Sequence, residues 1–259
     1  MTNIDFTKSE QYILSIRLSA DGFSFSIHHP QKRDEQYYSS YEVNASYSLT
    51  ANLKEMIAST EAFNHQYRQT NILVDTQRAT SIPFDLFEDE YTDTFFYHVF
   101  PPNKHETVLC NILGKSNIAL LFGMDKYAHQ LLNEHFPKAN IYACISPIIE
   151  HFTKESSKSN TRKLYAYLQK EKMEVFAFDR GKLLLTNSFH CKLIADQVYY
   201  LLYIWQQLGF NQTKDHLELI GACEKEELLT ELNKFLRHTH TLPFQQSLPF
   251  DLQTLMICE

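Results

Sequence analysis

The strongest constraint on the fold is an order of predicted elements that occurs twice along the chain. Residues 12–75 and residues 163–222 each contain three short β-forming runs, then an apolar helical stretch, then a further β-forming run. A strand that follows a helix in this way usually pairs in parallel with an earlier strand of the same sheet. The repeat therefore predicts two α/β units of the form βββαβ, each built on its own sheet.

The first copy begins with a predicted hairpin. Residues 12–18 are rich in β-formers, Asp21-Gly22 supplies a tight turn, and residues 23–27 alternate apolar and polar side chains. The alternation over residues 39–48 predicts a third strand. A helix and a buried strand that ends at Asp75 complete the copy.

The second copy repeats this order with a tight turn at residues 179–181. Its helix is predicted over about 192–208, and its last strand, residues 217–220, ends on Gly221-Ala222. A charged helix at 224–236 follows. The tail carries Leu-Pro-Phe twice, and because proline lacks a backbone donor, we expect this segment at a sheet edge or packed over the surface.

The stretch between the copies predicts an inserted piece. Residues 85–97 have a helical pattern, and a second hairpin flanks Gly114-Lys115-Ser116. A phosphate loop would need glycine where Leu109 stands and a helix after the loop, so Gly-Lys-Ser is interpreted as a turn. We predict a first half at residues 1–156, with an inserted ββαβα subdomain at about 100–153, and a second half at 157–259.

Composition and charge argue against several classes of protein. The net charge is −7 and the basic residues are scattered, which argues against a nucleic-acid partner. The five cysteines are odd in number and widely spaced, as expected of free thiols in a reducing compartment. The longest apolar run, residues 198–205, is far shorter than the roughly 20 residues that span a bilayer. We expect a cytoplasmic protein with no direct membrane insertion.

The duplicated βββαβ order is that of the ribonuclease H-like fold, and two copies with an inserted ββαβα piece resemble the actin-like ATPase superfamily. Within it, the chain is similar to a family of uncharacterised bacterial proteins with an actin-like fold. Residues 14–22 (LSIRLSADG) and 179–189 (DRGKLLLTNSF) carry that likeness. More distantly, the chain resembles the actin-like cytoplasmic proteins of pilus and secretion assembly, which act as assembly platforms.

The resemblance implies where phosphate chemistry would reside. Actin-like ATPases carry an Asp-x-Gly-Thr/Ser signature at the first hairpin of each half, where the Asp positions magnesium and water and the Gly admits phosphate to backbone amides. In the first hairpin of this chain, Arg17 or Ser19 stands about where that Asp would be. Asp21-Gly22 lies in the turn, and we favour the interpretation that it serves the turn's own geometry.

The second hairpin departs further from the signature. Residues 166–169 contain neither Asp nor Gly, and the bulky Tyr167 and Gln169 would obstruct a phosphate. A third element of the family, a strand that ends in small residues over the adenosine, is half preserved as Gly221-Ala222. Without metal and phosphate positioning, most of what catalyses phosphoryl transfer is missing.

These patterns favour a non-catalytic actin-like protein that acts as a cytoplasmic scaffold or regulatory partner of another protein, without a cofactor or metal. The first alternative is an ATP-binding switch or weak ATPase with a diverged cleft. In that case ATP and magnesium would be bound, with Asp21, Gly22, Gly221 and Ala222 as the nucleotide-binding residues. The second alternative is a self-associating structural protein, because actin relatives often polymerise.

Overall fold

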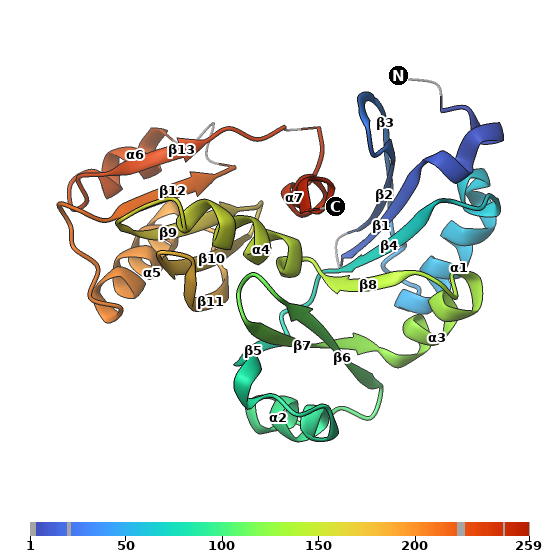
Figure 1. The fold of residues 1–259 in the computed structure, drawn as a ribbon, viewed down its shortest axis with the longest axis horizontal. Coiled ribbons are helices and arrows are strands. Elements are labelled where there is room, and N and C mark those ends of the chain that lie inside the picture. The colour runs from blue at the N-terminus through green and yellow to red at the C-terminus, as the bar shows by residue number, and fades with distance from the viewer. Residues whose placement is uncertain (1–3, 20–21, 222–225, 246, 259) are drawn as a thin grey trace. The chain divides into compact units, whose positions relative to one another are not determined.

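The computed structural model describes residues 4–19, 22–221, 226–245 and 247–258 (Figure 1). The chain folds into two compact units. The first comprises Met1–Ile148 together with Asp251–Glu259, and the second comprises Ile149–Phe250. This division differs from the predicted halves, because it lies inside a helix and returns the last residues to the first unit.

The first unit is built on a five-stranded sheet with the order β3-β2-β1-β4-β8. β1, β2 and β3 form an antiparallel meander, β4 pairs in parallel with β1, and β8 pairs in parallel with β4. This confirms the predicted βββαβ order. The elements are β1 (Ile13–Ser19), β2 (Gly22–His29), β3 (Lys32–Tyr41), α1 (Leu49–Ser59), β4 (Gln69–Val74), α3 (Lys126–His135) and β8 (Asn140–Ala143), with 3-10 turns η1 (Phe6–Gln11) and η2 (Glu61–Asn64).

Sequence periodicity extended the third strand too far. β3 ends at Tyr41, seven residues before the predicted end at 48. Beyond it, the Asn44 backbone N–H donates to the Asn52 side-chain oxygen at 2.6 Å, and Tyr47 N–H donates to the Asn44 carbonyl at 3.0 Å. These bonds form a capped turn that leads into α1, so the backbone groups are satisfied without a strand partner.

The inserted piece has its own three-stranded sheet with the order β5-β7-β6. β8, which the sequence analysis placed within the inserted piece, pairs instead with β4 of the main sheet. The helix expected over residues 85–97 begins only at Thr92, and two single 3-10 turns precede it. Short helices depend on burying an apolar face, and only Phe96 of this helix is buried. The elements are β5 (Ala79–Pro83), η3 (Phe84–Leu86), η4 (Asp89–Tyr91), α2 (Thr92–Val99), β6 (Glu106–Leu113) and β7 (Ile118–Asp125).

The second unit repeats the architecture with a five-stranded sheet in the order β11-β10-β9-β12-β13. β9, β10 and β11 are antiparallel, and β12 pairs in parallel with both β9 and β13. Trp205, Leu201 and Ile204 of α5 are buried against this sheet. The elements are β9 (Arg162–Leu168), β10 (Lys172–Asp179), β11 (Lys182–His190), α5 (Ile194–Gln207), β12 (His216–Ile220), α6 (Glu226–Leu232) and β13 (Thr239–Leu242).

Two helices differ from the sequence-based expectation. The polar residues 154–162 (KESSKSNTR) predict a linker between the halves, but α4 (Ile145–Ser156) extends into them. β13 lies at a sheet edge and includes only Leu242 of the Leu-Pro-Phe segment that was expected there or over the surface. The tail also forms α7 (Phe250–Cys258), which the sequence did not predict. Leu252 and Leu255 of α7 are buried, so packing stabilises a helix that is too short to form alone. None of the helices in the described ranges has the length and apolarity needed to cross a membrane.

Candidate functional site

An ion-pair network occupies the end of β1 in the first unit, where the family resemblance would place a phosphate-binding residue. The Arg17 side chain donates from Nε to the Asp251 carboxylate at 2.7 Å and lies 3.5 Å from Asp75. Ser19 Oγ donates to the same Asp75 oxygen at 3.1 Å. Asp75 follows β4, the parallel neighbour of β1, so the sheet itself brings the two strand ends together.

The network is almost closed to solvent. The side chains of Arg17 and Asp251 are 12% and 2% exposed. Burial by itself lowers the pKa of the Arg17 guanidinium, but the carboxylates of Asp251 and Asp75 outweigh burial and raise that pKa. Burial also raises the pKa of the neighbouring Cys144 thiol well above its usual value, and the charge of Asp251 raises it further. Both effects hold Arg17 as a cation and Cys144 as a neutral thiol.

A cavity of about 250 Å³ lies beside this network, lined in part by Ser19 and Asp75. Its other ionisable lining groups are Glu106 and Asp125, and none of the described lining residues is a lysine or an arginine. Glu106 accepts two bonds from Arg78, at 2.7 and 2.8 Å, and Asp125 caps α3 through the Ala128 N–H at 2.8 Å. The carboxylates of Glu106 and Asp125 are therefore already bound to other groups of the protein.

In the second unit, aromatic packing occupies the region of the second hairpin. The Phe250 N–H donates to the Tyr167 hydroxyl at 3.3 Å, and their ring centroids lie 5.5 Å apart. Both residues are 7% exposed. Phe152 stacks on Tyr165 at 3.9 Å and lies 5.7 Å from Phe250. The Tyr167 side chain, which lies on β9, is therefore packed in the core of the second unit.

The predicted nucleotide-binding residues fall into three groups. Asp21 and Ala222 lie outside the described residues. Gly22 begins β2 in the first unit, opposite Ser19 in the hairpin register. Gly221 follows β12 in the second unit at φ +81°, where a Cβ would collide with the Leu168 carbonyl oxygen. The close approach of the ends of β9 and β12 therefore requires glycine at position 221, whether or not a nucleotide binds there.

Taken unit by unit, the described residues at these strand ends differ from the phosphate and magnesium contacts that the resemblance implied. In the first unit, the cation at the strand end is neutralised by two carboxylates, and the adjacent cavity presents further carboxylates to an anionic phosphate chain. A cavity of about 250 Å³ is also below the roughly 300–1,000 Å³ of ordinary small-molecule sites. In the second unit, Tyr167 stands where a small residue would be needed.

Sequence reasoning identified Arg17 as a departure from the family signature but missed its partner. Asp251 lies 234 positions away in a tail that carried no helical prediction. The structure also gathers His216, His238 and His240 on β12 and β13, with His216 and His238 stacked at 4.8 Å. Parallel rings do not aim their nitrogens at one point. Within the described ranges, no group of three or more His, Cys, Asp or Glu side chains could hold a metal ion.

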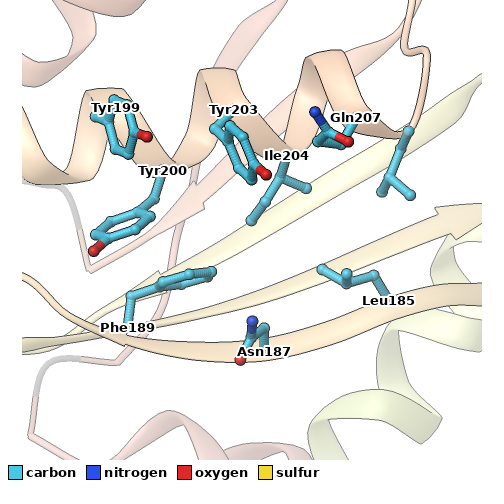
Figure 2. A pocket seen from close by; sticks show the side chains of 9 residues that line it. Leu185, Asn187, Phe189, Tyr199, Tyr200, Tyr203, Ile204 and Gln207 are labelled. Carbon is cyan, nitrogen blue, oxygen red and sulfur yellow. The ribbon is translucent and has the colours of Figure 1, made fainter.

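An apolar groove of about 270 Å³ lies between β11 and α5 in the second unit (Figure 2). Tyr200 and Ile204 point from the helix toward the strand, and Leu185 and Phe189 lie opposite them. Phe189 and Tyr200 stack with centroids 4.4 Å apart. The groove is lined by Leu185, Asn187, Phe189, Tyr199, Tyr200, Tyr203, Ile204, Gln207 and Leu208, none of which carries a charge.

Comparison with known proteins shows the family. A family model described as "Protein of unknown function (DUF3822)" matches residues 1–239. The chain belongs to the DUF3822 family. It is 43% identical to a Bacteroides thetaiotaomicron protein whose crystal structure has an actin-like ATPase fold and unknown function, with a TM-score of 0.88 over 99% of this chain and 100% of that one. The actin-like ATPase fold is therefore shown for this DUF3822 chain, as its duplicated sheets predicted.

A second solved structure is similar in fold alone. The type IV pilus biogenesis complex of PilM and PilN matches with a TM-score of 0.54 and 9% identity, over 89% of this chain and 88% of that one. A search of curated protein sequences gave no match. The predicted distant likeness to pilus-assembly proteins is thereby confirmed at the level of the fold.

Proposed function

We propose that this DUF3822 protein is a non-catalytic actin-like protein that acts in the cytoplasm by binding another protein, as a scaffold or regulatory partner. The observation that carries the proposal is the Arg17–Asp251–Asp75 network at the end of β1. Where an ATPase of this fold requires a carboxylate available for magnesium and water, this chain has a cation committed to two protein carboxylates. Phosphoryl transfer depends on positioned metal and phosphate, and these residues supply neither.

The second unit supports the same proposal independently. Tyr167 on β9 is buried against Phe250, so its ring fills the space that a phosphate hairpin would keep open. An ATP-binding switch is disfavoured because each unit uses its hairpin region for protein packing. The comparison structure of PilM with PilN is a complex between an actin-like protein and another protein, which is compatible with a binding role but carries no residue-level argument.

The direct test is thermal unfolding of the full chain with millimolar ATP and magnesium. A ligand that binds the native state at 100 times its Kd stabilises that state by about 2.7 kcal/mol, which shifts the melting temperature measurably. We expect no shift with ATP or ADP, and no phosphate release above a heat-denatured control. A reproducible shift, or magnesium-dependent hydrolysis, would overturn the non-catalytic proposal in favour of the nucleotide switch.

The binding role needs a positive test as well. Affinity purification of the tagged protein after cross-linking in its host should recover a reproducible protein partner in near-stoichiometric amount. Recovery should be unchanged when the cells are depleted of ATP before cross-linking, because the proposed function does not use a nucleotide. Absence of any specific partner at native expression would argue against a scaffold.

A further inference from the structure

Within the second unit, no described strand lies beyond β11 at one edge of the sheet. β11 is the outermost strand, and in the part of the chain that the structure describes it pairs only with β10. Its outer row of backbone N–H and C=O groups is thus a template for an added strand. Proteins commonly use such an edge to bind an extended peptide, with backbone bonds giving affinity and side-chain pockets giving specificity.

The groove beside this edge supplies the side-chain pockets. Leu185, Asn187 and Phe189 occupy alternate positions of β11, so they share the face that is turned toward α5 (Figure 2). On the helix, Tyr199 and Tyr203 stack at 6.0 Å and remain 62% and 49% exposed. Exposed tyrosines beside an apolar groove are typical anchors at protein interfaces.

The charge around the strand indicates the chemistry of the occupant. Residues 180–192 contain Arg180, Lys182, His190 and Lys192 but no Asp or Glu, although the whole chain carries a net charge of −7. At one end, Asp179 pairs with Arg180 while Lys182 has no ion-pair partner among the described residues. At the other end, Lys192 and His190 each lie 3.9 Å from the single carboxylate of Glu171.

The same charges disfavour a second copy of this chain on the edge. An antiparallel pairing of two β11 strands about Thr186 would bring Lys182 of each copy to the strand end that Lys192 follows in the other copy, with no Asp or Glu in residues 180–192 of either copy. Like charges directly opposite each other destabilise a strand pair. Terminal lysines also protect sheet edges from aggregation, but the strand between them, residues 183–189, carries no charge.

We propose that the groove between β11 and α5 docks an extended segment of a partner protein, which adds to β11 as a further strand. Alternate apolar side chains of the segment enter the groove, and carboxylates at its two ends meet Lys182 and Lys192. The inference rests on the proposed binding function and gives that function a surface and a partner chemistry.

The first test is selection of binders from a phage-displayed library of random twelve-residue peptides, using the full chain as target. We expect recovered peptides to alternate apolar residues over a central stretch and to carry Asp or Glu at the flanks. Failure to recover any binder, or recovery of peptides with basic flanks, would overturn the proposal.

Substitutions then locate the binding. In fluorescence polarisation with a recovered peptide, Tyr203→Lys should weaken binding at least tenfold, and Lys182→Glu should weaken it and improve a charge-reversed peptide. Tyr127→Lys on α3 is the matched control, because Tyr127 is 56% exposed, against 49% for Tyr203, but lies in the first unit. Equal affinity of Tyr203→Lys and the control would place the peptide elsewhere and overturn the assignment. Circular dichroism checks that each variant is folded.

N-methylation of the peptide tests strand addition itself. The backbone N–H groups of alternate peptide residues point to the same side, so two methylated peptides can be made. In one, the methyl groups remove the N–H groups that face β11; in the other, they remove those that face away from it. We expect one methylated set to lose binding and the other to retain it. Equal retention by both sets would overturn strand addition.

Two further results separate this inference from the proposed function. A dimer in sedimentation velocity that Tyr203→Lys dissociates would identify a second copy as the occupant and overturn the peptide. A failed peptide selection combined with no response to ATP would overturn the groove alone and leave the non-catalytic function standing. A response to ATP together with a peptide bound at the groove would overturn the non-catalytic function and leave the groove assignment standing.

Discussion

The Arg17 guanidinium donates to the Asp251 carboxylate at 2.7 Å, joining the first strand of the protein to its last helix across 234 positions of sequence. Asp75 and Ser19 complete the polar environment around this pair. Because Asp251 is buried and the Arg17 side chain is only 12% exposed, the contact is far more consequential than a surface ion pair. It fixes α7 to the first unit and gives the strand end a structural role.

Removal of one partner should destabilise the first unit strongly. We expect Arg17→Ala or Asp251→Ala to lower its free energy of unfolding by about 3–5 kcal/mol, because each leaves a buried charge without its partner. Replacement of both, as Arg17→Met with Asp251→Leu, should recover much of that loss. Urea denaturation measures the effect, with Lys158→Ala at an exposed pair as the control. Equal, small effects for all variants would show that the pair is not structurally important.

Cys144 should report the opening of the same region. Burial and the nearby Asp251 raise the pKa of its thiol, so we expect very slow alkylation by iodoacetamide at pH 8 in the native protein. Asp251→Ala should accelerate the reaction by loosening α7 and exposing the thiol. Cys191 in the second unit, also fully buried, serves as the internal control and should stay protected. Peptide mapping by mass spectrometry follows both sites, and acceleration at both would indicate global unfolding instead.

Gly221 should not tolerate a side chain. Its φ of +81° is disfavoured for other residues, and a Cβ would collide with the Leu168 carbonyl. Gly221→Ala is therefore expected to lower the stability of the second unit by more than about 1 kcal/mol. Gly114 is the matched control, because nothing lies within 4 Å of a Cβ built there. Thermal unfolding compares the two, and a neutral Gly221→Ala would contradict the close strand approach.

The histidine cluster predicts a pH dependence in the second unit. Burial first, and the charge of His238 second, lower the pKa of His216 below its unfolded value of about 6.5. The folded protein therefore favours the neutral His216 ring. The stability gained from this preference is fully present above about pH 6.5. It is lost as the pH falls below that value toward the lower pKa of His216 in the folded protein. Glu218 opposes the shift, and Lys163 and His240 reinforce it.

This dependence can be measured by urea denaturation between pH 5 and 8. We expect His238→Gln to flatten the loss of stability at low pH, because it removes a like charge from beside His216. Gln212→Asn, a neutral change in the neighbouring loop, should leave the slope unchanged. A slope that is identical in His238→Gln and the parent protein would show that the stacked rings are not coupled.

Local sequence pattern determined the two βββαβ copies, the inserted hairpin and the departures from the phosphate signature at Arg17 and Tyr167. These features depend on side-chain periodicity and on turn residues, which act over a few positions. The same periodicity wrongly predicted that the third strand continues past Tyr41 and that α2 begins before Thr92. Periodicity does not show where the backbone N–H and C=O groups form hydrogen bonds outside a strand or helix.

The tertiary structure alone decided what those residues do. Asp251 could not be matched to Arg17 from the sequence, since nothing local links a tail helix to the first strand. The pairing of β8 with β4, the contact of Phe250 with Tyr167, and the groove between β11 and α5 likewise depend on segments that are distant in the chain. Such contacts form because burial favours whichever surfaces the fold brings together, and that free energy is not encoded in any short stretch of sequence.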